Sequence, residues 1–370
     1  ASMIHNEMRK HGKILVLGYS VEGFNEKDNG VEVLLKDNPS LQADMVVLAI
    51  GVTPDTALAK EAGLELGIKG SIVVNDRMET SVPDIYAAGD AVQVKHYVTG
   101  DDALISLAGP ANKQGRIIAD NICGGDSRYL GSQGSSVIKV FDMTAATTGI
   151  NETNAKKSGL DVDTVILSPM SHAGYYPGGK VMTMKVVFEK ETYRLLGAQI
   201  IGYEGVDKRI DVLATAIHAG LKATQLKDLD LAYAPPYSSA KDPVNMAGFM
   251  IDNIAKGTLK QWHLEDMDKI SKDKSVVLLD VRTVGEFNRG HMDGFRNIPV
   301  DELRERINEI EKGKPVYLIC QSGLRSYIAS RILEGNGYET YNFSGGFRFY
   351  DAVVNDRALI ERAYACGMDY

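Results

Sequence analysis

The stretch that decides the fold of the C-terminal part of the chain reads VYLICQSGLRS, from Val316 to Ser326. Its four apolar residues, 316–319, predict a strand, and the apolar spacing after Ser326 predicts a helix that follows at once. Cys320 is therefore expected at the carboxyl end of a strand and beneath the N-terminus of a helix. Because free backbone N–H groups and the helix dipole favour an anion there, a thiolate or a persulfide anion would be stabilised.

The loop after the cysteine supports this interpretation. Gly323 allows the loop to curl so that successive amides point inward, and Arg325 adds a positive charge that can favour a thiolate or attract an anionic sulfur donor. We predict Cys320 and Arg325 as catalytic residues. The remaining candidate residues of the persulfide loop are Gln321, Ser322, Gly323, Leu324 and Ser326. The alternative is that Cys320 is an inert buried cysteine at a strand end.

The segments around this loop predict alternating strands and helices. Strands are expected at 275–280, 315–319 and 339–343, and helices at 301–312 and 326–334. Strands that alternate with helices favour a parallel sheet, so residues 260–370 are predicted to form an α/β domain.

Four short segments in this region resemble the rhodanese family. They read LDVR at 279–282, EFNRGHM at 286–292, NIP at 297–299 and FSGGF at 343–347. Four residues separate Cys320 from Arg325, which matches the short loop of sulfurtransferases rather than the longer loop of phosphatases. The resemblance implies sulfane-sulfur transfer with the persulfide on Cys320. Phe347 departs from the family's usual tryptophan, and we interpret Asp280 and His291 as structural residues.

The front of the chain alternates short apolar runs with polar turns. The runs 14–17, 31–35, 45–50, 71–74 and 84–88 predict strands, and the spacing after Gly109 and Pro110 predicts a helix from Ala111 to Asn121. A linker rich in Gly and Ser at 124–136 separates this part from a predicted α+β unit at 136–255. That unit is expected to contain strands at 137–141, 181–188 and 194–201 and helices at 151–158 and 206–219.

Three front segments resemble the FAD- and NAD(P)-linked disulfide reductases. They read AIGVTPDT at 49–56, IYAAGDA at 85–91 and LAGPANKQGR at 107–116. The resemblance implies that Asp90 binds the ribityl-phosphate portion of FAD and that the helix near Ala111 points its N-terminus at the flavin ring, where it would stabilise a reduced, anionic flavin. The alternative for Asp90 is a helix-capping carboxylate. The implied FAD-binding residues are Gly89, Asp90, Gly109, Pro110, Ala111, Asn112 and Tyr233, and Gly51 is implied for NAD.

The α+β unit resembles the dimerisation domain of the same enzymes, and most closely that of the coenzyme A-disulfide reductase branch. The resemblance rests on SHAGYYPG at 171–178 and AYAPPYSSAKDP at 232–243. It implies a homodimer in which Tyr233 and either Tyr175 or Tyr176 reach the partner's flavin and sulfur site, while Lys241 meets a coenzyme A phosphate. The alternative for the tyrosines is packing at a turn. We interpret His172 as structural.

One departure from the family is large, because the chain contains no GxGxxG fingerprint, and the family uses one for FAD and one for NAD(P)H. No residue here matches the redox cysteine of the branch either. We therefore expect a chain that begins partway through the NAD(P)-binding domain and whose reductase half does not work alone. The expected domains are the rest of an NAD(P)-binding domain at 1–55, the C-terminal part of an FAD-binding domain at 56–130, a dimerisation domain at 136–257 and a rhodanese domain at 260–370.

Composition limits the partners. A formal net charge of -8 and a pI near 5.5 argue against a nucleic-acid or anionic-membrane surface and favour small-molecule sulfur substrates. No apolar run approaches a membrane span and no signal peptide is evident, so we expect a cytoplasmic protein. The three cysteines predict neither a disulfide framework nor a metal site. Cys123 is expected to be a helix-end residue, and Cys366 a tail residue with no role.

The resulting hypothesis is an enzyme in which NADH or NADPH reduces FAD, and the flavin supports reduction of coenzyme A disulfide, coenzyme A persulfide or polysulfide. Cys320 would deliver or accept sulfane sulfur, and Tyr175 and Tyr233 would position or protonate the departing sulfur. Three alternatives stay open. They are a plain sulfurtransferase on a non-catalytic flavoprotein scaffold, a flavoprotein of the NADH oxidase or peroxidase type, and a non-enzymatic sulfur carrier or binding module.

Overall fold

The computed structural model describes residues 1–365, and the chain divides into two compact units. One unit comprises residues 1–96 and 100–132 with the C-terminal segment that begins at Val353, and the other comprises residues 97–99 and 133–352. Cys366 lies outside the described residues. None of the described helices is both long enough and apolar enough to cross a bilayer.

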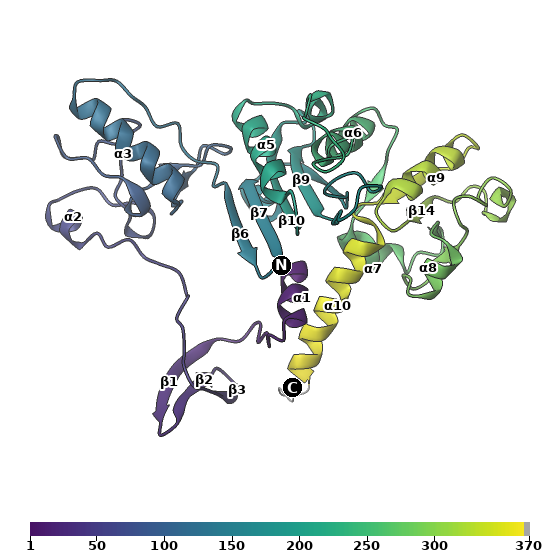
Figure 1. Ribbon diagram of the computed structural model, residues 1–370, viewed down its shortest axis with the longest axis horizontal. Helices are drawn as coiled ribbons and strands as arrows, with labels where there is room; N and C mark the ends of the chain where they lie inside the picture. The colour runs from purple at the N-terminus through teal and green to yellow at the C-terminus, as the bar shows by residue number, and fades with distance from the viewer. Residues whose placement is uncertain (366–370) are drawn as a thin grey trace. The chain divides into compact units, whose positions relative to one another are not determined.

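The first unit begins with helix α1 (Ser2–Lys10) and a three-stranded antiparallel sheet. Its strands β1 (Val21–Lys27), β2 (Gly30–Leu35) and β3 (Asn38–Ala43) lie in chain order (Figure 1). The strand predicted at 31–35 is confirmed as β2. The strands predicted at 14–17 and 45–50 are wrong, because the structure forms no strand over either run. An apolar run is a strand only where a second chain segment completes its hydrogen bonds.

The rest of this unit consists of short elements around a small core of Met78, Val92 and Val94. The longest element is helix α3, which begins at Ala108 rather than at the predicted Ala111 and ends at Ile122. The strands predicted at 71–74 and 84–88 reduce to isolated bridges at Ile72 and Tyr86. The other elements are α2 (Ala57–Glu61), η1 (Ile68–Gly70), η2 (Gly89–Ala91), β4 (Val94–Lys95) and β5 (Asp102–Ala103).

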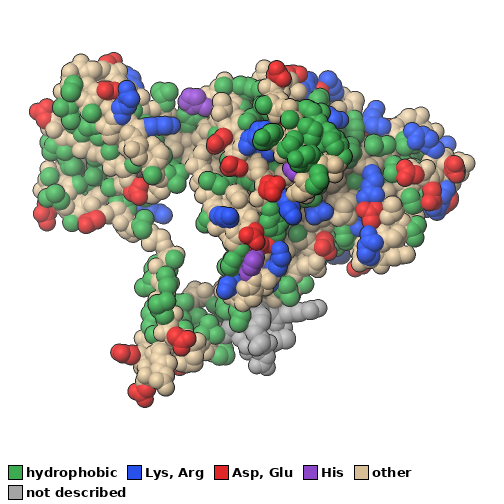
Figure 2. Space-filling view, viewed as in Figure 1, with side chains coloured by type: hydrophobic (Ala, Val, Ile, Leu, Met, Phe, Trp, Pro, Cys, Tyr) green, Lys and Arg blue, Asp and Glu red, His purple; other side chains and the backbone are tan. Residues whose placement is uncertain are grey.

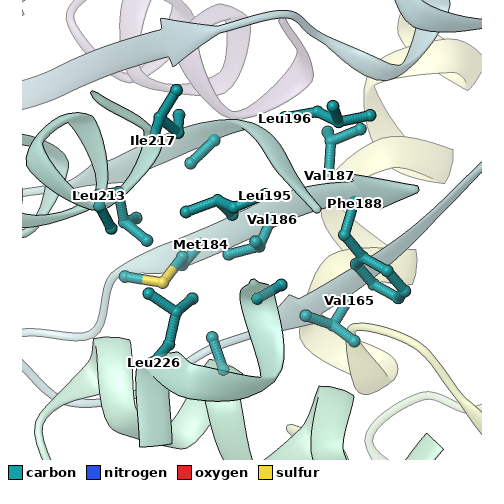
Figure 3. Close-up of a cluster of buried hydrophobic side chains, with 14 of the residues drawn as sticks. Val165, Met184, Val186, Val187, Phe188, Leu195, Leu196, Leu213, Ile217 and Leu226 are labelled. Atoms are coloured by element: carbon teal, nitrogen blue, oxygen red, sulfur yellow. The ribbon is translucent and has the colours of Figure 1, made fainter. Parts of the chain in front are cut away.

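The second unit opens with a five-stranded antiparallel sheet of order β6-β7-β10-β9-β8. Its strands are β6 (Ser136–Val140), β7 (Met143–Gly149), β8 (Val162–Leu167), β9 (Thr183–Glu189) and β10 (Leu195–Gly202). The helical elements are α4 (Glu152–Lys157), α5 (Val206–His218), η3 (Ala223–Asp228) and α6 (Pro243–Ala255). All three strands and both helices predicted in this region are confirmed. Side chains such as Met184 from the sheet, Leu213 from α5 and Leu226 from η3 form a dry core between the sheet and the helices (Figure 3).

The second unit continues into a five-stranded sheet whose strand pairs are all parallel, as the sequence predicted. Its order is β11-β15-β14-β12-β13, with strands β11 (Gln261–Trp262), β12 (Val277–Asp280), β13 (Arg296–Asn297), β14 (Val316–Ile319) and β15 (Thr340–Phe343). The helical elements are η4 (Leu264–Asp266), α7 (Met267–Ile270), α8 (Val284–Asn288), η5 (Ile307–Glu309), α9 (Leu324–Glu334) and the start of α10 (Gly346–Ala365), whose residues from Val353 onward belong to the first unit.

One predicted helix, at 301–312, is wrong. This segment consists of turns and the short η5, with backbone bonds such as Glu305 N to Glu302 O and Ile310 N to Ile307 O. It buries Leu303 and Ile310. The apolar spacing that suggested an α-helix is therefore met by successive three-residue turns, which present side chains at nearly the same interval.

The two sheets of the second unit are joined by polar contacts at β8. Gln261 donates to the Thr164 carbonyl at 2.8 Å, and the His263 ring lies 3.0 Å from the Asp163 carboxylate. The Ile166 amide donates to the Ser344 hydroxyl at 3.1 Å. Because Ser344 directly follows β15 and precedes α10, this contact reaches the segment that backs the Cys320 loop.

Candidate functional site

Cys320 lies where the sequence places it, directly after β14 and just before α9. Its side chain is fully buried, and its Sγ accepts hydrogen bonds from the Gly323 amide at 3.1 Å and from the Ser326 hydroxyl at 3.2 Å. Gly323 has φ +98°, a conformation that a glycine adopts without strain and that curls the loop back over the sulfur. The Ser326 hydroxyl also lies 3.1 Å from the Gly323 carbonyl, so it links the sulfur to the turn of the loop.

The loop is held from behind by the first turn of α10. The amides of Phe347 and Arg348 donate to the carbonyls of Cys320 and Gln321, at 2.8 and 3.2 Å. Gly346 has φ +67°, and a Cβ atom on it would stand 2.7 Å from both Gln321 O and Ser322 N. Only a residue without a side chain fits so close to the loop. The backbone of α10 therefore sets the position of the loop carbonyls.

Arg325 is engaged by a carboxylate that the sequence analysis did not single out. Its two terminal nitrogens each donate to Glu286 at 2.7 Å, and this pairing lowers the pKa of Glu286 to about 2. Glu286 also forms a capping box with Thr283 at the start of α8. That spacing is visible in the sequence, but it signals only a helix start and not a partner for Arg325.

Asp280 and His291 have the structural surroundings that the sequence analysis expected. Asp280 is fully buried and forms an ion pair with Arg282 at 2.6 Å, and Arg282 also donates to the Gly290 carbonyl at 2.8 Å. The exposed His291 ring stacks on Phe287, with ring centroids 3.9 Å apart. The Arg282 guanidinium lies 3.8 Å above the centre of the Phe347 ring, so the position that commonly holds tryptophan in the family still offers an aromatic face.

A cavity of about 480 Å³ opens beside the loop at Gln321. It is lined by Arg282, Glu286, Arg289, Gly290, Gln321, Phe347, Arg348 and Asp351. On the face shown in Figure 2, basic and acidic side chains are interspersed over the molecule. The cavity reaches the loop at Gln321, the residue after Cys320, and its size suits a small organic molecule.

The tyrosines of the second candidate site are exposed and linked to each other. The Tyr175 and Tyr233 hydroxyls lie 2.7 Å apart, and this hydrogen bond raises the pKa of Tyr233. Tyr176 packs edge-on against the buried His172, whose Nδ1 lies 3.1 Å from the Ala173 carbonyl. Tyr175 is 76% exposed, so its position is not explained by packing at a turn.

Beside these tyrosines lies a cavity of about 540 Å³, lined by Ser171, His172, Glu204, Gly205, Lys208, Arg209, Ala232, Tyr233, Ala234, Pro236 and Tyr237. The residues around this cavity are held in place by Arg209, which the sequence analysis missed. Arg209 is buried, pairs with Asp242 at 3.0 Å, and donates to the carbonyls of Ser171 and Tyr237. The exposed Lys241 directly precedes Asp242 in the chain. A buried arginine on a mainly apolar helix gives no signal in one sequence, because it looks like a surface charge.

The predicted flavin-binding residues other than Tyr233 lie in the first unit, whereas Tyr233 belongs to the second. The Gly89 amide donates to the buried Gln114 side chain at 2.7 Å, which joins η2 to α3. The residues Gly109, Pro110, Ala111 and Asn112 form the first turns of α3, whose N-terminus receives no side-chain cap. Asp90 is exposed in η2 and does not cap α3. An acidic side chain next to uncapped helix amides fits the polar part of a dinucleotide cofactor, whereas Gly51 lies outside these elements in an exposed segment without helix or strand.

Comparison with protein families gives three matches. Residues 1–115 match the pyridine nucleotide-disulphide oxidoreductase model, residues 135–243 its dimerisation domain, and residues 263–352 the rhodanese-like domain. A curated relative from Pyrococcus furiosus, an NAD(P)H sulfur oxidoreductase (CoA-dependent), is 39% identical over 240 residues, which are 65% of this chain and 52% of the relative. The chain thus spans about half the length of this relative.

Two solved structures share the fold. The reduced CoADR-RHD of Bacillus anthracis superposes with a TM-score of 0.93 at 46% identity, covering 96% of this chain and 64% of that one. The NAD-dependent persulfide reductase of A. fulgidus superposes with a TM-score of 0.87 at 40% identity, covering 95% of this chain and 63% of that one. These similarities extend over all three matched regions.

Proposed function

Because the chain belongs to the pyridine nucleotide-disulphide oxidoreductase family and carries a rhodanese-like domain, we propose that it acts in NAD(P)H-dependent reduction of coenzyme A disulfide, coenzyme A persulfide or polysulfide. In this proposal Cys320 carries the sulfane sulfur. The observation that supports it most directly is the buried Cys320 sulfur held by the Gly323 amide and the Ser326 hydroxyl.

The sulfur step follows from this geometry. The Cys320 thiolate attacks the outer sulfur of a donor persulfide, the donor's S–S bond breaks, and the donor leaves as a thiolate. The product is a persulfide on Cys320, and a thiolate acceptor takes the outer sulfur by the same exchange in reverse. No net oxidation occurs. Gly323 and Ser326 stabilise the negative sulfur at both stages, and Arg325 with the rest of the loop, Gln321, Ser322 and Leu324, keeps the amides in place.

The reductase part of the proposal rests on family membership and on the residues that fit a cofactor. FAD, when bound, would relay electrons from the nicotinamide to the sulfur substrate. Asp90 and Gly89, with the N-terminal residues 109–112 of α3, would hold it, and Gly51 would lie on the NADH or NADPH side. Tyr175, Tyr176 and Tyr233 would orient the sulfur substrate, and Lys241 would meet a coenzyme A phosphate.

We also propose a homodimer, because the chain has the dimerisation domain of this family and its strand β6 exposes apolar side chains. Val137 and Ile138 are 59% and 61% exposed. A second copy that covers this edge would bury them. The proposed domains remain 1–55, 56–130, 136–257 and 260–370.

A second candidate function is sulfur transfer alone. It is favoured by one observation, that every contact described around Cys320 comes from residues 280–348 of the same unit. The polar contacts of the sulfur itself therefore all come from the rhodanese-like region.

Mass spectrometry after incubation with polysulfide tests the sulfur step. We expect a gain of about 32 Da, one sulfur atom, on the wild-type chain and on Cys123→Ser, and none on Cys320→Ser. No gain on the wild type would reduce Cys320 to an inert buried cysteine. Flavin absorbance and NADH consumption with coenzyme A persulfide then separate the two functions, because a pure sulfurtransferase shows neither.

A further inference from the structure

The cavity beside Gln321 is lined by more positively charged side chains than acidic partners neutralise. Two of its charged side chains are neutralised by their own partners, since Arg282 pairs with Asp280 and Glu286 pairs with Arg325. The remaining charged groups that line it are Arg289, Arg348 and Asp351. Among the described side chains, neither Arg289 nor Arg348 takes part in an ion pair, so two cations face one carboxylate.

Both arginines are carried by backbone that is tied to the sulfur loop. The Arg348 amide donates to the Gln321 carbonyl at 3.2 Å. On the other side, Arg282 holds the carbonyl of Gly290, the residue after Arg289, at 2.8 Å. The Phe347 ring lies between these anchors beneath the Arg282 guanidinium. The backbone that carries both arginines is therefore fixed next to the Cys320 loop, while the two side chains are exposed at the mouth of the cavity.

The size of the cavity favours an organic anion over a small inorganic one. Its volume of about 480 Å³ lies within the usual range for organic ligands and far exceeds the space that thiosulfate needs. An aromatic wall and two guanidinium groups suit a molecule with an organic body and acidic groups, because guanidinium binds carboxylate and phosphate oxygens in pairs.

We propose that Arg289 and Arg348 select the sulfur donor or acceptor of Cys320 as a thiol or persulfide whose organic part carries carboxylate or phosphate groups. This inference rests on the proposed sulfur-carrying role of Cys320. The exchange is the one already described: the donor's S–S bond breaks as the bond to Cys320 forms, and the donor leaves as an acidic thiolate. The two arginines bind the acidic groups and do not touch the reacting sulfur.

The test measures persulfide formation on the full chain with three donors. Glutathione persulfide carries carboxylates, coenzyme A persulfide carries phosphates, and the persulfide of N-acetylcysteamine has no acidic group on its organic part. The variants are Arg289→Gln, Arg348→Gln and their combination, with Arg304→Gln as the matched control because Arg304 lines a different groove of the same domain.

We expect the double variant to raise KM for at least one acidic donor by about tenfold or more, with kcat unchanged within about twofold and with KM for the neutral donor unchanged. Whichever acidic donor is affected more identifies carboxylate or phosphate as the recognised group. Arg289→Lys with Arg348→Lys should restore part of the affinity, since the charge remains.

Equal KM changes for acidic and neutral donors, or no change in any, would overturn the inference while leaving the role of Cys320 intact. Failure of all three donors to load wild-type Cys320 would instead overturn the proposed function, and this inference with it. Thermal unfolding of each variant shows whether a lost affinity reflects lost folding.

Discussion

Two regions of the second unit are built on the same device, a buried arginine paired with a buried aspartate, yet they present different chemistry. Arg282 pairs with Asp280 beside the Cys320 loop, and Arg209 pairs with Asp242 beneath the exposed tyrosines. Each arginine also donates to loop carbonyls, those of Gly290 in one region and of Ser171 and Tyr237 in the other. In both regions the N–H groups of one planar guanidinium hold a loop in place.

The difference lies in where the reactive groups point. The sulfur of Cys320 is fully buried and receives both of its donors from its own loop. Tyr175 and Tyr233 are 76% and 46% exposed and contact each other at their hydroxyls. In the first region, a single stretch of the chain encloses the Cys320 sulfur and supplies its donors. The second presents its polar groups outward, which is the arrangement expected when the rest of a site comes from another molecule.

The largest expected effect is on the buried pairs themselves. Arg209→Leu leaves Asp242 buried without its cation, so we expect a loss of about 3–5 kcal/mol in the free energy of unfolding, measured with urea. Arg282→Leu should cost a similar amount and should also slow sulfur loading of Cys320. Arg209→Leu should leave the loading rate per folded molecule unchanged.

The matched control is Arg194→Leu, because Arg194 is half-exposed and lies 4.0 Å from Glu189. Its cost should stay below about 1 kcal/mol. If Arg209→Leu cost no more than this control, the buried pair would not be the frame of the tyrosine region.

The next largest effect is expected where the start of α10 contacts the Cys320 loop. Gly346→Ala places a Cβ 2.7 Å from Gln321 O, so the loop must shift, and we expect sulfur loading to fall by about tenfold. Gly337→Ala is the control, because Gly337 also has positive φ but nothing lies within 4 Å of its Cβ. Equal losses in both variants would mean that backbone strain, and not the displaced loop, causes the effect.

A smaller effect appears in acid. The Arg325 guanidinium lowers the pKa of Glu286 from 4.5 to about 2. The ion pair therefore stabilises the fold fully above pH about 4.5, and this contribution is lost as the pH falls toward about 2. We would measure the melting temperatures of wild type and Glu286→Gln between pH about 6 and pH about 2. The difference between the two should become smaller as the pH falls through that window. A constant gap would show that the pairing does not titrate.

The smallest effect is expected at the exposed tyrosines. Tyr175→Phe removes a hydrogen bond between two accessible hydroxyls, so stability should change by less than about 0.5 kcal/mol in urea unfolding. The pKa of Tyr233 should move back down, because its hydrogen bond with Tyr175 raises it. A large loss of stability would mean that this pair is structural, in which case it is not available for a substrate.

The spacing of apolar residues predicted secondary structure best in the domain whose strands pair with one another. In the antiparallel sheet the segments around Val186 and Ile200 alternate with helices that cover them, and all five predicted elements are present. In the first unit the run 45–50 has the same apolar character, yet Ile50 is 90% exposed and no strand forms. A strand depends on a neighbour that its own residues do not specify.

The sequence by itself singled out Cys320 as the candidate nucleophile and predicted most of the elements around it and the family resemblances. The chemistry of Cys320 depends on a loop of a few adjacent residues, and such local patterns are written in the chain. Only the tertiary structure decided that Glu286 binds Arg325, that Arg209 frames the tyrosines, and that Arg289 and Arg348 line one cavity. These groups are separated by 24 to 59 positions, and a single sequence records which charges exist but not which of them packing brings within a few ångströms.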